Sequence, residues 1–126
     1  MTSPAHEGLE RGPRAAAISN TIAQLLHDYS GRGPTRARTT IGDDLIVCVL
    51  ADALTKSESG LVQAGEQAIV LEQRSTLQKI MRDDAIAAVE SLSGRTVTAF
   101  MSNNHIDPDV AVETFVLEPL PRPERY

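Results

Sequence analysis

The chain has 126 residues, of which 41% are hydrophobic and only 3% aromatic, and its formal net charge is −5. These values indicate one domain with an aliphatic core, and the negative charge argues against nonspecific nucleic-acid binding, which depends on clustered Lys and Arg. The single Cys48 excludes an internal disulfide, no apolar run approaches the ~20 residues that a membrane span needs, and the N-terminus lacks a signal-peptide pattern. We therefore expect a cytoplasmic protein without membrane insertion, metal or cofactor.

The first part of the chain predicts a tail followed by a helix. Residues 1–12 mix Pro, Gly and charge without periodicity, and we expect them to be disordered, before a single domain over residues 13–118. From Pro13, a favourable first helical residue, apolar side chains at helical spacing predict an amphipathic helix that ends at Gly31. At the other end of the chain, the Pro-rich residues 119–126 predict a loose tail.

Two strands should follow the first helix. Residues Thr35–Ile41 are rich in Thr and alternate with Arg36 and Arg38, which predicts a strand with one charged face. After a turn at residues 42–44, the unbroken apolar run Leu45–Ala51 predicts a central strand that is buried on both faces.

The run from Thr55 to Gly94 is long and periodic enough for one extended helix. Thr55 and Glu58 form a capping-box pattern at its start, and Gly94 suits its end. Its predicted apolar stripe consists of Leu77, Ile80, Met81, Ala85, Ala88, Val89 and Leu92, and its polar face includes Arg74, Gln78, Lys79, Arg82, Asp83 and Glu90. Unbroken, it would be about 55 to 60 Å long, against about 35 Å for the diameter of a compact domain. We expect a break near Gly60 or Gly65, and packing of its N-terminal part on a second copy.

The last third of the chain predicts two more strands, Thr96–Met101 and Val110–Leu117, joined by a polar loop over residues 103–109. The order α-β-β-α-β-β predicts an α+β fold, in which a four-stranded, mostly antiparallel sheet is covered by two main helices, the second one long. The expected core contains Val47, Leu50, Met81, Ala85, Val89, Phe100 and Phe115. Ser-Gly-Arg follows the helix in each half, at residues 30–32 and 93–95, which leaves an internal duplication open.

Arginines are the most informative charges. Two follow helix ends and two lie on the first strand: Arg32, Arg95, Arg36 and Arg38. Together their guanidinium groups could bind a small anion such as bicarbonate, phosphate or a nucleotide. The alternative is a solvated strand edge whose charges prevent aggregation.

Other reactive side chains favour structural roles. His105, Asp107 and Asp109 are close in sequence but match no metal signature and are typical of a turn. Cys48 lies in an apolar strand, which favours a buried structural thiol. The chain contains no G-x-S-x-G, P-loop or Cys-x-x-Cys motif, so we predict no catalytic residues.

A set of short motifs gives the chain a recognisable order. The motifs are Gly31-Arg32-Gly33-Pro34, Asp43-Asp44, Leu54-Thr55 with Glu58, Gly65, Arg74, Gly94-Arg95, Phe100-Met101-Ser102 and Asp107-Pro108-Asp109. From about Ala15 to Glu118, their order and spacing resemble the MpsC-like family of bacterial proteins, long catalogued as a domain of unknown function. The resemblance implies a soluble protein associated with a sodium-translocating, membrane-potential-generating system, whose other members are linked to uptake of dissolved inorganic carbon.

The resemblance transfers no catalytic residue, and we therefore expect a non-enzymatic accessory or regulatory subunit. A membrane protein of the sodium-translocating system is its expected partner. The alternatives are a small-anion sensor that uses the arginines, and an enzyme of unrecognised type. We also expect a homodimer, whose contact would involve apolar residues beyond the reach of the chain's own sheet: Leu61, Val62, Ile69 and Leu71.

Overall fold

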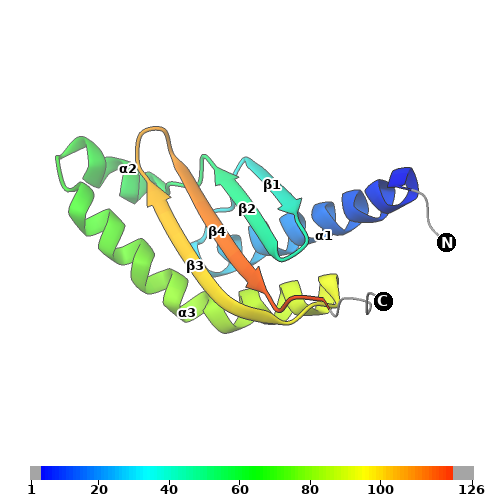
Figure 1. Cartoon of the computed structure of the whole chain (residues 1–126). Helices are drawn as coiled ribbons and strands as arrows, with labels where there is room; N and C mark the ends of the chain where they lie inside the picture. Colours follow the sequence, from blue (N-terminus) through cyan, green and yellow to red (C-terminus); the bar gives the residue numbers. More distant parts are fainter. Residues whose placement is uncertain (1–3, 121–126) are drawn as a thin grey trace.

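The computed structural model describes residues 4–120. It contains helices α1 (Pro4–Ser30), α2 (Lys56–Gln63) and α3 (Gln67–Ser93) and strands β1 (Arg36–Ile41), β2 (Leu45–Ala51), β3 (Val97–His105) and β4 (Val110–Leu117). The strands form one antiparallel sheet in the order β1-β2-β4-β3, and α1 and α3 lie together against one of its faces (Figure 1). The predicted α+β architecture is confirmed, with one more helix than expected.

Helix α1 begins earlier than the sequence predicted. It starts at Pro4 rather than Pro13, so the tail expected over residues 1–12 is helical from Pro4 onward. The helix continues through Pro13 because the fixed φ of proline is compatible with helical geometry, although the ring removes one amide donor. Residues 1–3, and residues 121–126 of the expected C-terminal tail, lie outside the described residues.

The long helical run breaks at Gly65, one of the two expected positions. Gly65 has φ +81°, which favours glycine, and it separates α2 from α3, whereas Gly60 stays inside α2. The predicted capping box is present, because Thr55 Oγ1 accepts a hydrogen bond from the amide of Glu58 at 3.1 Å and the Glu58 carboxylate accepts one from the amide of Thr55 at 2.9 Å. At the other end, Gly94 adopts the expected left-handed conformation.

The strands match the prediction except at β3. This strand continues to His105, through residues that were expected to form a polar loop. It continues because Asn103 and His105 pair with Val112 and Val110 of β4, which supplies backbone partners despite the polar side chains. The connecting turn is therefore short and contains a cis peptide bond between Asp107 and Pro108.

The core lies between the sheet and the helices. It consists of apolar residues from α1, α3 and every second position of the central strands: Ile18, Ile22, Leu26, Ile46, Cys48, Leu50, Ala53, Met81, Ala85, Val89, Ala111, Phe115 and Leu117. The expectation that β2 is buried on both faces is wrong for a single chain, since burial alternates along the strand and Val47 is only half-buried. Phe100 is also half-buried, although its ring centroid lies 5.0 Å from that of Phe115.

Helix α3 buries most of the predicted stripe, including Met81, Ala85 and Val89, but its buried face also includes two residues that were expected to be polar and exposed. Arg74 and Gln78, which were assigned to the polar face, are buried, whereas Ile80, assigned to the apolar stripe, is 61% exposed. The two polar side chains are accommodated because each has a hydrogen-bonding partner in the interior. The N-terminal half of the buried face of α3 therefore carries paired polar side chains, and the C-terminal half carries the predicted apolar ones.

The two α-β-β halves use their Ser-Gly-Arg segments in the same way. In each half the serine hydroxyl accepts a hydrogen bond from the arginine amide, at 3.3 Å for Ser30 and Arg32 and at 3.1 Å for Ser93 and Arg95. Each guanidinium then donates to the carbonyl of the first residue after the second strand of its own half, at 3.1 Å to Asp52 and 2.9 Å to Glu118. Together with the antiparallel pairing of β2 and β4, this correspondence supports the internal duplication.

Candidate functional site

A groove of about 620 Å³ opens on the helical side of the molecule, where the C-terminal end of α1, the N-terminal end of α2 and the first half of α3 meet. We call it the α2 groove. Its lining residues are Tyr29, Ser30, Thr55, Ser57, Glu58, Ile69, Glu72, Gln73, Arg74, Thr76, Leu77 and Ile80. The residues from α3 recur at steps of three and four, so they share one face of that helix.

An ion pair buried to more than nine-tenths forms part of the lining of the groove. Arg74 Nε donates to Glu58 Oε2 at 3.0 Å, and its Nη2 donates to Oε1 at 3.1 Å, with side-chain exposures of 9% and 7%. Burial acts to raise the pKa of Glu58, but the Arg74 guanidinium and the Thr55 amide outweigh it, so the pKa is lowered. Glu58 is therefore a fixed carboxylate that is already paired, and it serves structure rather than proton transfer.

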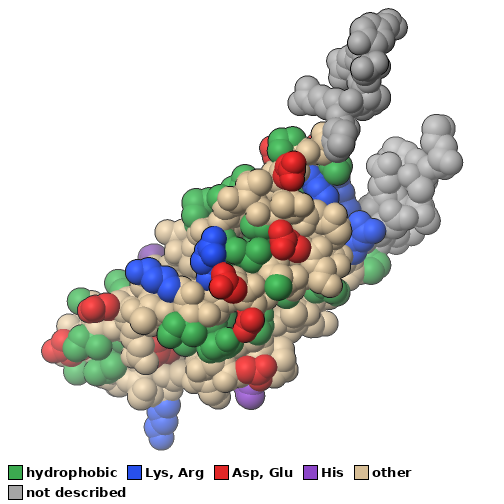
Figure 2. All heavy atoms as spheres, turned by 90° about the horizontal axis from the view of Figure 1, so that it is seen from below, with side chains coloured by type: hydrophobic (Ala, Val, Ile, Leu, Met, Phe, Trp, Pro, Cys, Tyr) green, Lys and Arg blue, Asp and Glu red, His purple; other side chains and the backbone are tan. Residues whose placement is uncertain are grey.

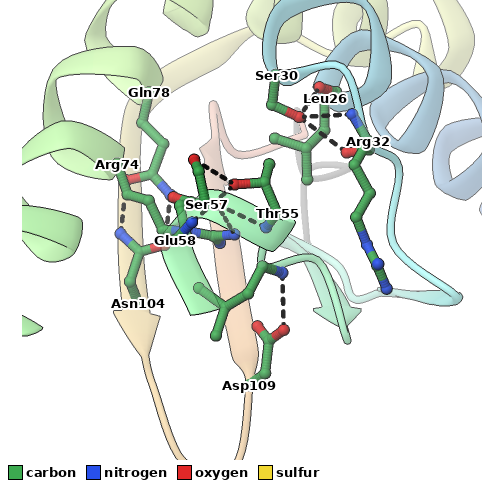
Figure 3. A network of polar contacts seen from close by, with 11 residues as sticks. Leu26, Ser30, Arg32, Thr55, Ser57, Glu58, Arg74, Gln78, Asn104 and Asp109 are labelled. Atoms are coloured by element: carbon green, nitrogen blue, oxygen red, sulfur yellow. Dashed lines mark hydrogen bonds and ion pairs between the residues drawn. The ribbon is translucent and has the colours of Figure 1, made fainter. Parts of the chain in front are cut away.

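Polar contacts around this pair connect α2 to the sheet (Figure 3). Gln78 and Asn104 exchange two amide hydrogen bonds, at 2.8 and 2.9 Å. On the other side, the Asp109 carboxylate accepts a hydrogen bond from the Leu54 amide at 2.7 Å, immediately before the α2 cap. The end of the groove at α2 is thus held by residues from α3, β3 and the β3–β4 turn.

The rim of the groove is apolar and exposed. Ile69 and Ile80 are 48% and 61% exposed, and Tyr29 is 40% exposed. The Tyr29 hydroxyl donates to Asp84 at 2.7 Å, and this hydrogen bond raises the pKa of Tyr29. Figure 2, seen from below relative to Figure 1, shows hydrophobic side chains interspersed with acidic and basic ones. Large aliphatic side chains held open beside a concave surface are typical of a docking site.

A second polar cluster lies beneath the groove, inside the molecule. Thr39, Cys48, Glu113 and Ser102 face one another in register across the four strands, and Ser102 donates a hydrogen bond to the Glu113 carboxylate. Burial raises the pKa of Glu113, and the Ser102 hydroxyl offsets only part of that effect. Burial likewise raises the pKa of Cys48, which fits the predicted inert thiol. A cavity of about 20 Å³ separates Glu113 from the Glu58–Arg74 pair.

The four arginines of the predicted anion site do not converge. Arg32 donates to the carbonyl after the C-terminal end of β2, and Arg95 donates to the carbonyl after the C-terminal end of β4. Because β2 and β4 run antiparallel, these two strand ends lie at opposite ends of the sheet. Arg36 and Arg38 are exposed on one face of β1, as predicted, and line a hollow of about 280 Å³ with Val49, Ala51 and Val110. Only this second pair remains together.

The four residues of the predicted dimer contact are also separated. Leu61 and Val62 are half-buried on α2, and Leu71 is 38% exposed. Ile69 lines the α2 groove, but Leu71 lies about 200° further around α3, since each residue turns an α-helix by about 100°. One surface therefore does not include all four, and self-association itself stays a prediction.

The loop with His105, Asp107 and Asp109 serves the turn. His105 Nδ1 lies 2.8 Å from the Pro108 carbonyl oxygen, and Asp109 binds the Leu54 amide. Among the described residues, no group of three or more His, Cys, Asp or Glu side chains is placed to hold a metal ion.

These features define a small α+β domain with an open, partly apolar groove on its helical side. A family model described as "Na+-translocating membrane potential-generating system (MpsC)" matches residues 10–119, and the chain belongs to this family. It is also 23% identical over 103 residues to the uncharacterized protein YrhF of Bacillus subtilis (strain 168), a match that covers 80% of this chain and 84% of the relative. No solved structure matches the chain. None of the helices in the described part of the chain is long and apolar enough to cross a membrane.

Two residues of this groove could be singled out from the sequence. Glu58 was identified for its cap and Arg74 for its place in the family pattern, but their pairing across 16 positions was missed. The signal that could have revealed it is the step of four from Val70 to Arg74 and from Arg74 to Gln78, which puts the arginine on the same helix face as buried Val70. An arginine on a buried face requires an anionic partner.

Proposed function

We propose that this protein is a non-enzymatic accessory or regulatory subunit of a sodium-translocating, membrane-potential-generating system, and that the α2 groove binds a segment of its membrane-protein partner. Membership of the MpsC family over residues 10–119 is the observation that carries the proposal, because the description of the family names such a system. The groove supports it by offering an exposed docking surface.

The chemistry of the groove favours a basic, amphipathic partner segment. Ile69, Leu77 and Ile80 provide an aliphatic surface at helical spacing. Arg74 is already paired with Glu58, so Glu72 leaves the lining with an excess negative charge. Membrane proteins carry an excess of Lys and Arg in their short cytoplasmic segments, which makes such segments complementary to this groove.

Complementation of a deletion strain tests this function. The strain that lacks the gene should lose part of its sodium-dependent membrane potential, measured with a potential-sensitive dye at high and low Na⁺. Wild-type protein should restore that component and Ile80→Asp should not, because a charge would disrupt the apolar rim. Ser75→Asp is the matched control, since Ser75 is exposed on α3 outside the groove. Full restoration by Ile80→Asp, or a deletion without effect, would contradict the proposal.

The rival function, small-anion sensing, now depends on Arg36 and Arg38, which share one face of β1. Bicarbonate, phosphate and nucleotides should then raise the melting temperature, and Arg36→Ala should remove the increase without changing the unliganded value. An accessory subunit without an anion site gives no such increase.

A further inference from the structure

The face of the sheet opposite the helices is apolar along its two central strands, and no helix within residues 4–120 packs on it. We call it the outer sheet face. It is formed by the residues of the strands that point away from the core. Most of them are apolar or carry Thr: Thr40, Leu45, Val47, Val49, Ala51, Ala99, Met101, Val110, Val112, Thr114 and Val116. Polar and charged side chains lie on the same face at one end of the two edge strands: Arg36, Arg38, Asn103 and His105. The two central strands, β2 and β4, contribute mostly Val to it, whereas a solvated sheet face normally carries polar side chains at these positions. Such a face is expected to be covered in the working protein.

We propose that the outer sheet face binds the same face of a second copy, so that the protein is a two-fold symmetric dimer built as a sheet-on-sheet sandwich. The occupant is inferred from shape and charge. Regular antiparallel strands with Val side chains pack well against a similar sheet at a separation of about 10 Å. The chain itself supplies such a sheet, and a two-fold contact uses one self-complementary surface.

Charge selects the direction of the two-fold axis. Arg36 and Arg38 lie at the start of β1, and they have no ion-pair partner among the described residues. Asp43 and Asp44 lie in the hairpin turn just beyond the end of the same strand, and both are exposed. Asp43 forms an ion pair with Arg11 of α1 at 3.1 Å, whereas the Asp44 carboxylate has no ion-pair partner among the described residues. A two-fold axis that runs between the two sheets and across the strands places the start of β1 over the β1–β2 turn of the other copy, so the arginines of each copy lie near Asp44 of the other. An axis parallel to the strands would instead place β1 over β3, where Arg36 and Arg38 meet His105 and Asn103.

The size of the face is close to what a stable dimer needs. Four strands about 4.8 Å apart and about seven residues long cover roughly 450 Å² in plan. Two copies therefore bury a projected area of roughly 900 Å², without the additional surface area of protruding side chains. This value is near the lower limit of about 1,000 Å² for specific interfaces. We expect a reversible dimer rather than an obligate one.

Sedimentation of the full chain tests the proposal. Wild-type protein at micromolar concentration should have the mass of a dimer, and Val112→Glu should be monomeric with an unchanged circular dichroism spectrum. Ile69→Glu and Ile80→Glu, on the helical side, should remain dimeric. A wild-type protein that is monomeric at ~100 μM, or a dimer that dissociates with Ile69→Glu but not with Val112→Glu, would overturn the proposal.

Charge exchange provides a test that does not depend on core packing. The variants Arg36→Glu/Arg38→Glu and Asp44→Lys alter exposed residues that form no ion pair among the described residues, and each should weaken self-association at least about tenfold. Mixed together, they should form a heterodimer with near wild-type affinity, because every contact across the axis again joins opposite charges. Failure of the mixture to recover affinity would contradict the proposed axis. Flotation of monomeric wild-type protein with phosphatidylglycerol vesicles, abolished by Arg36→Glu/Arg38→Glu, would assign the face to anionic lipid instead.

Discussion

Glu58 has two structural tasks, because its carboxylate caps α2 and also pairs with Arg74. The backbone of α2 and the interior of α3 are thereby joined through one side chain. The sequence contains both parts of the capping box three residues apart, and this local pattern was predictable. The ion pair was not, because it depends on how α3 rotates after the break at Gly65.

Arg74→Ala should destabilise the fold by about 3 to 5 kcal/mol, because it leaves the Glu58 carboxylate buried without a cation. Arg82→Ala is the matched control. Arg82 forms an ion pair with Asp83 at the surface, and its loss should cost about 0 to 1 kcal/mol. Urea denaturation at neutral pH measures both changes, and a similar small loss for the two variants would show that the buried pair contributes little.

Glu113→Gln should change the pH dependence of stability. The folded-state pKa of Glu113 is raised by burial, so its contribution is fully present below the ordinary glutamate pKa and is lost as pH rises through the folded pKa. Wild-type protein should therefore lose stability relative to Glu113→Gln as pH rises above the ordinary glutamate pKa. The lowered pKa of Glu58 acts in the opposite direction and only at lower pH, where its contribution is lost. Parallel denaturation profiles for the two proteins above pH 5 would contradict the raised pKa.

At the scale of elements, sequence patterns predicted the strands better than the helices. The bounds of β2 and β4 coincide with the predicted runs, because turn residues bound an unbroken apolar run in β2 and an alternating one in β4. Strand β3 was predicted too short, since Asn103–His105 are polar and gain their strand conformation from pairing with β4. The burial of Arg74 and Gln78 on α3 was missed for a similar reason, because their hydrogen-bonding partners are distant in sequence.

Alanine substitutions of Gly65 and Gly60 test which of the two glycines breaks the long helical run. Gly65 lies at the break between α2 and α3, and Gly60 lies inside α2. Gly65→Ala should cost about 1 to 2 kcal/mol, because φ at this position is +81° and a Cβ atom disfavours that conformation. Gly60→Ala should instead stabilise by about 0.5 to 1 kcal/mol, since Gly60 is helical and a Cβ atom there meets open space. Chemical denaturation of both variants measures the difference. Stabilisation by Gly65→Ala would favour one continuous helix.

At the scale of the whole molecule, each α-β-β half contributes one long helix that packs on the sheet: α1 contacts β1 and β2, and α3 contacts β3. Their helices pack on one face, and the opposite face keeps an apolar surface that no helix of the described residues covers. The strong hydrophobicity of β2 indicated that both faces of this strand are covered. The sequence could not show that the helices of the chain cover only one of them. Likewise, the shared Ser-Gly-Arg segments suggested converging arginines, and the pairing of β2 with β4 places Arg32 and Arg95 at opposite ends instead.

The central claim, that the α2 groove of this MpsC-family protein binds a membrane-protein partner, is tested most directly by photo-crosslinking in cells. A benzoylphenylalanine residue at position 80, on the exposed rim, should form an adduct with a sodium-translocating membrane protein, identified by mass spectrometry. The same residue at position 75, outside the groove, should not form that adduct. Adducts of equal intensity at both positions, or adducts with soluble proteins alone at position 80, would contradict the account.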